Sequence, residues 1–371
     1  MYRGLVELGE EVKNLVKRKE WQLIADSPTA KYYTNWGLFD KYAKLEPREI
    51  DYQKPVGEWS TILGPCGYKG AHPSTIGVLA KPTESKLLAV HYYYLVDEPL
   101  FYEVDGGVSD IAVCIPSSST WVSQHIVIRA KPSSESKLLV YLPRRAPGST
   151  IVELLVDDNA YLDISMILEP DDNYPNAFII RKSIGRDAKV SSGLLVVGSS
   201  TARVEDDALL VGRGSEYRYS GLAIGRREGW IDFIANIVQV APLTKGVARV
   251  GGIALDSSKV VTRGLAKVSE EGIKSYSLFE AEVLILGDRA AGYTAPMMEI
   301  DTGDVEFATH HAAQYKEPEE IMFYLASRGL SPSEGLSLII RGKVETVLDK
   351  ARDRKLVEKA WSIVESYSLL A

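Results

Sequence analysis

Turn signals recur at an almost constant interval in the middle of the chain, and this spacing constrains the fold more than any other feature. Glycine-containing turns begin at Gly185, Gly198, Gly212 and Gly225, thirteen or fourteen residues apart, with short Val, Leu and Ile runs between them. Such a strand–turn cadence without intervening helices favours a parallel β-helix, in which each rung stacks on the previous one. A β-helix also suits a chain of 371 residues, because its core grows along one axis.

Both ends of the chain carry a helical pattern instead. Near the amino terminus, apolar residues recur every three or four positions: Leu5, Leu8, Val12, Leu15 and Val16. The Pro/Gly-marked stretches at residues 54–57 and 64–67 then indicate a change of structure. We therefore expect a mainly β protein: an N-terminal helical region at residues 1–55, a right-handed parallel β-helix at 56–314 and a C-terminal helical region at 315–371.

The C-terminal region is expected to contain three short helices. Residues 317–320 place a proline and acidic residues in a first turn, with Gly329 beyond the end of that helix. Ser331 and Glu334 form a predicted capping box for a second helix, which we expect to end at Gly342. A third helix is predicted from Asp353 to Leu369, with an apolar side that includes Leu356 and Val364.

The charge pattern argues against nucleic-acid and membrane binding. The 43 basic and 50 acidic residues are interspersed and give a net charge of −7, so no basic face for nucleic acid is evident. The amino-terminal segment is charged where a signal peptide needs an apolar stretch, and no run approaches the ~20 apolar residues of a bilayer span. A cytoplasmic location is expected.

Cysteine and histidine are scarce. Cys66 and Cys114 are far apart in the sequence and outside any CxxC spacing, which argues against a disulfide framework and a zinc site, so buried free thiols are expected. Of the five histidines, His72, His91, His125, His310 and His311, the last two are adjacent. On a strand, His310 and His311 point to opposite faces and cannot chelate one metal together.

Common catalytic signatures are missing from the sequence. There is no GxxxxGK[ST], HExxH or GxSxG motif. The enzymatic alternative is a β-helix carbohydrate lyase or hydrolase, in which Asp232, Glu216 and Arg218 would act along a groove. Fold alone does not imply such a function, and we expect a protein that is not an enzyme.

Five pieces of the segment from Gly264 to Gly342 form a recognisable series, at residues 263–268, 281–290, 296–300, 309–312 and 323–330. In their order and spacing they resemble the SufB/SufD family of SUF iron–sulfur cluster assembly scaffolds, and the segment is closer to SufD. The resemblance implies a β-helix that pairs with a SufB-like subunit or with a second copy. It also implies C-terminal helices that bind the SufC ATPase, with a transient cluster at the subunit interface.

The same resemblance implies roles for particular residues. His310 matches the histidine of SufD at that interface and is a candidate ligand, with His311 and Glu299 nearby, whereas Ala290 stands where SufB has a cysteine. Strands around Val283 to Ile300 are expected to meet the partner. The candidate ATPase contacts are Tyr324, Leu325, Arg328, Leu336 and Ile340. A homodimeric relative without cluster chemistry remains an alternative, and flavin binding is left open.

Overall fold

The computed structural model describes residues 9–18, 20–21, 33–44, 49–68, 79–95, 98–316 and 319–367. Leu5, Leu8, His72, Pro318 and Leu369, which figure in the sequence analysis, lie outside these ranges. The helices and short leading strands are α1 (Glu10–Lys17), α2 (Trp36–Tyr42), β1 (Asp51–Gln53), β2 (Thr61–Leu63), α3 (Lys86–Tyr93), α4 (Glu319–Ser327), α5 (Pro332–Leu348), a 3₁₀ turn η2 (Asp349–Ala351) and α6 (Arg354–Glu365).

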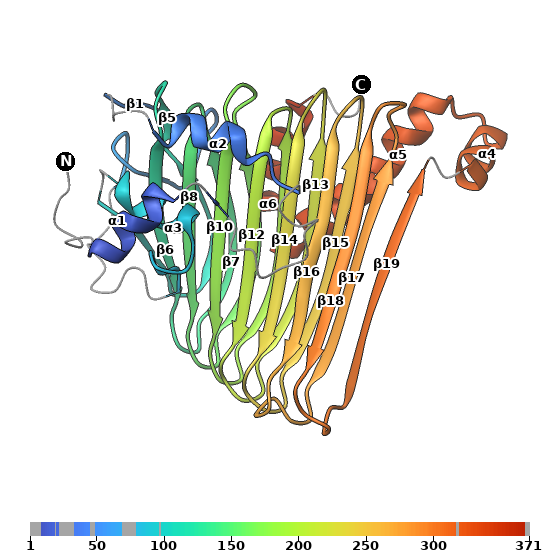
Figure 1. Cartoon of the computed structure of the whole chain (residues 1–371). Helices are drawn as coiled ribbons and strands as arrows, with labels where there is room; N and C mark the ends of the chain where they lie inside the picture. Colours follow the sequence, from blue (N-terminus) through green and yellow to red (C-terminus); the bar gives the residue numbers. More distant parts are fainter. Residues whose placement is uncertain are drawn as a thin grey trace.

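The remaining strands form the body of the molecule (Figure 1). They are β3 (Leu100–Val104), β4 (Gly107–Val113), β5 (Ile115–Ser117), β6 (Val122–Ala130), β7 (Glu135–Pro143), β8 (Gly148–Val156), β9 (Tyr161–Glu169), β10 (Asn176–Ile184), β11 (Lys189–Gly198), β12 (Thr201–Leu210), β13 (Glu216–Gly225), β14 (Trp230–Gln239), β15 (Lys245–Ala254), β16 (Lys259–Val268), β17 (Tyr276–Ile285), β18 (Ala291–Ile300) and β19 (Phe307–Lys316). Nearly all of them belong to two parallel sheets, which confirms the predicted parallel β-helix with helices at both ends.

Each rung contributes one strand to each sheet. The eight-stranded sheet runs β18-β16-β14-β12-β10-β8-β6-β3, and the nine-stranded sheet runs β19-β17-β15-β13-β11-β9-β7-β4-β2. Asn176 pairs with Ala202 and Lys259 with Ala291, so a full rung takes 26 to 32 residues. The interval of thirteen or fourteen residues in the sequence is therefore half a rung, because a turn occurs at each side of the flattened helix.

Alternate residues of both sheets point into a closed apolar interior. Ile180, Val204 and Phe233 are fully buried there, and the same core cluster continues from Leu63 to Val283 along the whole axis. The interior also holds a charged pair, since the Lys182 ammonium binds Asp206 and lies 5.2 Å from the Tyr219 ring. Two ions buried side by side compensate each other, whereas either one alone would be costly.

The turns between the sheets repeat one conformation. In successive rungs a residue with positive φ donates its N–H to the next turn, as Asn159 does to Arg186 O at 2.8 Å and Leu243 to Ile273 O at 2.9 Å. The equivalent positions are Ser133, Asn159, Asp187, Gly214, Leu243 and Lys274. Asn, Asp and Gly tolerate this left-handed region, whereas leucine does not favour it.

Helices cover part of each outer sheet face. At the N-terminal end, Trp21, Phe39 of α2 and Leu88 of α3 pack over Ile151 and Ile179 of the eight-stranded sheet. On the other face, α5, η2 and α6 bury Leu195, Leu222 and Ile253 of the nine-stranded sheet. No helix in the described ranges combines the length and apolar character needed to cross a bilayer.

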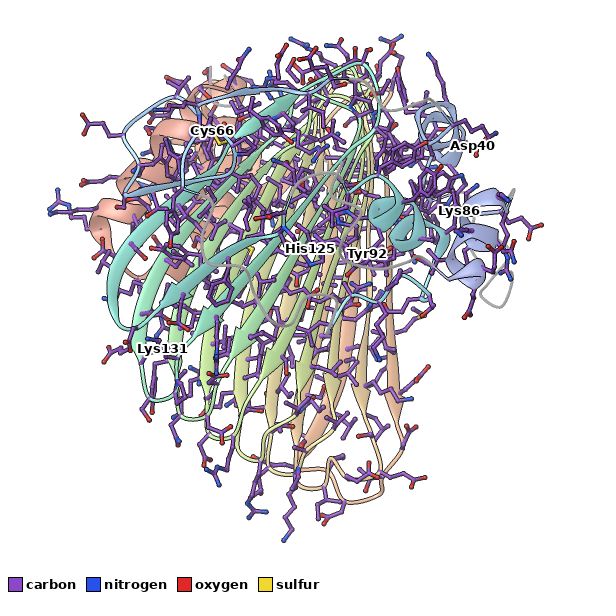
Figure 2. All side chains as sticks on the ribbon, turned by 90° about the vertical axis from the view of Figure 1, so that its left-hand side faces the viewer. Asp40, Cys66, Lys86, Tyr92, His125 and Lys131 are labelled. Atoms are coloured by element: carbon purple, nitrogen blue, oxygen red, sulfur yellow. A yellow bond between two sulfur atoms is a disulfide. The ribbon has the colours of Figure 1, made fainter. Side chains whose placement is uncertain are left out.

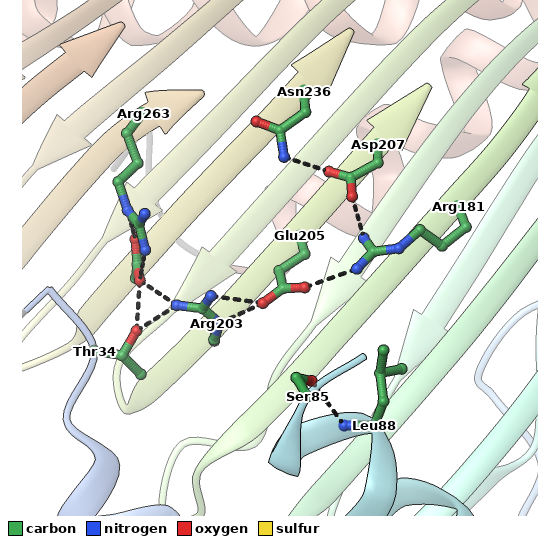
Figure 3. A network of polar contacts seen from close by, with 10 residues as sticks. Thr34, Ser85, Leu88, Arg181, Arg203, Glu205, Asp207, Asn236 and Arg263 are labelled. Carbon is green, nitrogen blue, oxygen red and sulfur yellow. Dashed lines mark hydrogen bonds and ion pairs between the residues drawn. The ribbon is translucent and has the colours of Figure 1, made fainter. Parts of the chain in front are cut away.

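An ion network extends along the outer face of the eight-stranded sheet (Figure 3). Asp232 accepts from Arg203 at 2.7 Å and from Arg263 at 2.9 Å, and it also binds Thr34, while Arg203 in turn contacts Glu205 at 2.6 Å. Burial alone would raise the pKa of the Asp232 carboxyl, but the two guanidinium groups lower it below its usual value. The network therefore fixes the segment around Thr34 to the body of the β-helix.

Cys66 and Cys114 form a disulfide, with 5.9 Å between their Cα atoms. The expectation of two free thiols was therefore wrong. The 48-residue separation conceals the fact that β2 and β4 are hydrogen-bonded neighbours, which brings the loop after β2 next to Cys114. Gly67 makes this loop possible, because a Cβ there would lie 2.2 Å from Ile62 O.

Two further expectations about the C-terminal helices have clear outcomes. The Ser331–Glu334 capping box is confirmed, with Pro332 at the first helical position. The predicted helix end at Gly342 was wrong, because α5 continues to Leu348. A Cβ at Gly342 would meet nothing within 4 Å, so this glycine marks an exposed helix position and not a helix end.

Candidate interface at the open end of the β-helix

The last two strands leave one end of the β-helix uncovered. β18 and β19 each pair on one side only, with β16 and β17 respectively, and each is the terminal strand of its sheet. Figure 1 shows them opposite the end that carries α1 and α3. Most side chains of β19 are exposed, in contrast to the alternating burial of β17. An unpaired strand edge is a template for pairing with another chain.

His310 lies on β19 and faces the interior side of this open end. Its register partner on β17 is Phe279, whose side chain is fully buried in the core cluster. Residues opposite each other in parallel strands share a face. Because no further rung covers β19, His310 is exposed although it lies on the inward-facing side.

His311 faces outward into a different environment. Its register partner is Glu280, and it lines a hollow of about 350 Å³ between the nine-stranded sheet and α5. Glu280 binds Arg249 at 2.6 Å in this hollow. Neighbouring residues of a strand point to opposite faces of the sheet, so His310 and His311 cannot bind one metal ion together.

Glu299 and Ala290 are not close partners of His310. Glu299 pairs in register with Lys267, binds its ammonium at 3.0 Å, and is outward-facing on the other sheet. Ala290 lies in the turn between β17 and β18, which follows the end of β17 that pairs with Lys316, whereas His310 pairs with Phe279 six residues earlier on β17. Among the described residues, no three His, Cys, Asp or Glu side chains form a group that could hold a metal ion.

The C-terminal helices divide into a buried part and an exposed part. Ile340 is only 4% exposed and packs with Val344 against the chain's own sheet, so we remove Ile340 from the set of partner contacts. α4 has no such cover: Phe323 is 79% and Tyr324 55% exposed. The guanidinium of Arg328, one residue beyond the end of α4, lies 5.2 Å from the Tyr324 ring. Leu325 and Leu336 are half-buried.

A polar cluster that sequence reasoning missed joins the open end to α5. Lys343 of α5 binds Glu282 of β17, which also accepts from the Tyr315 hydroxyl on β19. Burial would raise the pKa of the Glu282 carboxyl, but Lys343 and Tyr315 lower it below its usual value. The cluster ties β19 to the helices. Its only signal in the sequence is a pair of glutamates on the outward side of an otherwise apolar strand.

The three residues of the enzymatic alternative do not form a site. Asp232 is fully buried in the ion network of the eight-stranded sheet. Glu216 and Arg218 lie on β13 of the nine-stranded sheet and bind each other at 3.1 Å. The three residues expected to act along one groove therefore lie on two different sheets.

Comparison with known proteins identifies the class of protein that this fold and open end represent. Residues 113–343 match the family model described as "SUF system FeS cluster assembly, SufBD core domain". The match covers more than half of the chain, and the chain therefore belongs to the SufB/SufD family. It begins well before Gly264, where the resemblance first becomes clear in the sequence.

Individual relatives support the same family. A SufBD family protein of Pyrococcus horikoshii is 26% identical over 280 residues, which cover 73% of this chain and 62% of the relative. The iron–sulfur cluster assembly protein SufD of Bacillus subtilis is 25% identical over 301 residues, covering 77% and 67% respectively. A SufBD family protein of Synechocystis is 26% identical over 212 residues, covering 54% and 44%. The chain thus spans less than two thirds of some of these relatives.

Proposed function

We propose that the chain is a non-enzymatic scaffold subunit of a cytoplasmic SUF complex. Its open β-helix end pairs with a SufB-like subunit or a second copy, and its C-terminal helices bind a SufC-like ATPase. The observation that supports this proposal most directly is the uncovered edge of β18 and β19, where His310 is exposed. The chain's membership of the SufB/SufD family gives this edge its interpretation. Edge strands of this kind are usually shielded by charge, bulges or a partner.

The proposed role of His310 is to donate one iron ligand to a cluster completed by the partner. A neutral imidazole nitrogen can replace a thiolate at an iron–sulfur cluster. Both cysteines of this chain are held in the Cys66–Cys114 disulfide, so thiolate ligands have to come from elsewhere. The cluster is transient cargo of the assembled complex, and the isolated chain is expected to bind little iron.

The histidine pair provides its own matched control. We expect His310→Ala to leave partner binding intact while lowering the iron and sulfide content of the anaerobically reconstituted complex by more than half. His311→Ala should change that content little, because its side chain faces the hollow beside α5. A normal cluster load in His310→Ala would remove this histidine from the ligand set.

The second candidate function is a homodimeric family member without cluster chemistry, which a reconstituted wild-type complex that lacks iron and sulfide would favour. Ala290, at the place of the SufB cysteine, is the specific observation in its favour. Under this candidate, the protein still dimerises and binds an ATPase.

The ATPase is proposed to dock on α4 and the adjoining surface of α5. Removing residues 315–371 is a poor test, because it would uncover Leu195, Leu222 and Ile253 on the sheet. Phe323→Asp changes only an exposed side chain and should weaken binding of a SufC-like ATPase at least about tenfold. Val211→Asp, at a half-exposed turn position, is the control. Equal ATPase binding by both variants would exclude α4 as the dock.

A further inference from the structure

A basic hollow lies at the end of the molecule opposite to His310. It occupies about 520 Å³ between α1, α2 and α3, three helices that sequence reasoning did not connect. Figure 2 shows Asp40 and Lys86 in this region, on neighbouring helices. Its lining side chains include five cations, Lys13, Lys17, Arg18, Lys44 and Lys86, against the single acid Asp40.

The positive charge in this hollow is only partly compensated. Lys44 and Lys86 share the same carboxylate, Asp40, with Lys86 Nζ 3.4 Å away from it. Lys13 is paired with Glu10 at 3.2 Å. For Lys17 and Arg18, the described part of the chain provides no acidic partner. Like charges that converge on a concave surface create a potential that attracts anions.

Lys86 gives the hollow a preformed cationic base. Its side chain is 4% exposed, its ammonium donates to the Arg18 carbonyl, and it lies 4.6 Å from the Trp21 ring. Burial lowers the pKa of Lys86, and nearby Lys44 adds to this, although Asp40 opposes both. The protein thus maintains a desolvated cation where packing alone would favour an apolar residue.

An aromatic wall accompanies the cations. Tyr93 is 51% exposed, and its ring lies 5.1 Å from that of Tyr94 in an edge-to-face arrangement. The Tyr94 hydroxyl donates to the Ala43 carbonyl at 2.7 Å, which fixes the wall. An exposed aromatic face beside cations suits a planar ring that carries negatively charged groups.

Two other hollows of comparable size, lined by described residues, differ in charge. The hollow beside His311 balances Arg249 and Lys343 with Glu280 and Glu282. The third, near Glu169, has three arginines and three acids among its lining residues. From its charge surplus, its volume and its aromatic wall, we infer that the hollow between α1, α2 and α3 binds a nucleoside di- or triphosphate.

The test is isothermal titration of the full chain with ADP, inorganic pyrophosphate and adenosine as separate probes. The charge-reversal variant Lys17→Glu/Arg18→Glu alters exposed side chains without acidic partners in the described structure. We expect it to weaken ADP and pyrophosphate binding at least about tenfold at low salt, and less at high salt. Tyr93→Leu should weaken ADP binding several-fold and leave pyrophosphate unchanged. Lys355→Glu, an exposed lysine on α6, is the matched control.

Three outcomes would overturn the inference: no ADP binding at millimolar concentration, ADP binding that the double variant does not weaken, or binding of a single-stranded oligonucleotide without binding of ADP. The last outcome would point to a nucleic-acid surface instead. None of these results depends on His310, so failure here is distinguishable from failure of the proposed scaffold function.

Discussion

At the residue scale, Leu243 is the clearest conflict between sequence and backbone. It has φ of 59° at a turn position that Asn159 and Gly214 occupy in other rungs, and it is 43% exposed. Leucine costs about 1 kcal/mol in this region, whereas asparagine tolerates it because its short side chain can hydrogen-bond locally. Leu243→Asn should therefore raise the free energy of unfolding by about 1 kcal/mol in chemical denaturation.

Leu243→Ala separates strain from packing. It removes most of the side chain but keeps the unfavourable φ, so no gain in stability is expected. If alanine stabilised the protein as much as asparagine, exposure of the leucine and not backbone strain would be the cause.

Buried His91 should make stability depend on pH. The rings of His91 and His125 lie 5.4 Å apart beneath α3, where His91 Nδ1 contacts Ser149 Oγ at 2.9 Å and His125 Nε2 contacts Glu153 at 2.9 Å. Burial is the main reason why the pKa of His91 lies well below 6.5, and the neighbouring His125 and Arg144 lower it further. Below pH 6.5 the unfolded state therefore binds a proton that the folded state does not.

This difference predicts that stability falls as the pH drops below about 6.5. One fully linked proton corresponds to about 1.4 kcal/mol per pH unit. His91→Phe should flatten the dependence of the unfolding free energy between pH 6.5 and 5 by about that slope. An unchanged acid slope in the variant would show that other groups control it.

At the scale of elements, the docking of α5 depends on a glycine. A Cβ at Gly193 of β11 would lie 2.0 Å from Val347 O, so Gly193→Ala must displace the end of α5. The expected loss is about 1–3 kcal/mol. Gly342→Ala lies within the same helix with nothing near its Cβ and should stabilise by about 1 kcal/mol. Thermal unfolding measures the stability of both variants. A change in the same direction for both would contradict this account.

The elements that the sequence reveals are those whose signals are local. Turn cadence in 185–227 and the Ser331 capping box depend on residues close in the chain, and both are matched by the structure. The disulfide, by contrast, depends on which rungs are adjacent, and Cys66 and Cys114 are separated by 48 residues. Ile340 was misassigned for a similar reason, since an apolar stripe does not reveal whether its partner is another protein or the chain's own sheet.

At the scale of the whole molecule, the two ends of the β-helix differ in what covers them. The N-terminal end carries α1, α3 and the antiparallel pair β1–β5. At the other end β18 and β19 are the terminal strands, and Tyr293, Met297 and Phe307 on them are each more than 40% exposed. The sequence-based expectation placed the partner surface around Val283 to Ile300. Val283 itself is buried and β17 is covered by β19, so the available edge is β18 together with β19.

This asymmetry predicts that β18 and β19 become protected when the protein associates. Amide exchange in the isolated monomer should be fast along these two strands and slow in β12 and β14, which are hydrogen-bonded on both sides. In a homodimer, or on addition of a SufB-like partner, β18 and β19 should slow by at least about tenfold while β12 and β14 stay unchanged, because only the edges gain hydrogen bonds. Light scattering on the same samples reports the oligomeric state. A monomer at micromolar concentration that forms no heterodimer, or a dimer in which β18 and β19 still exchange rapidly, would place the interface elsewhere.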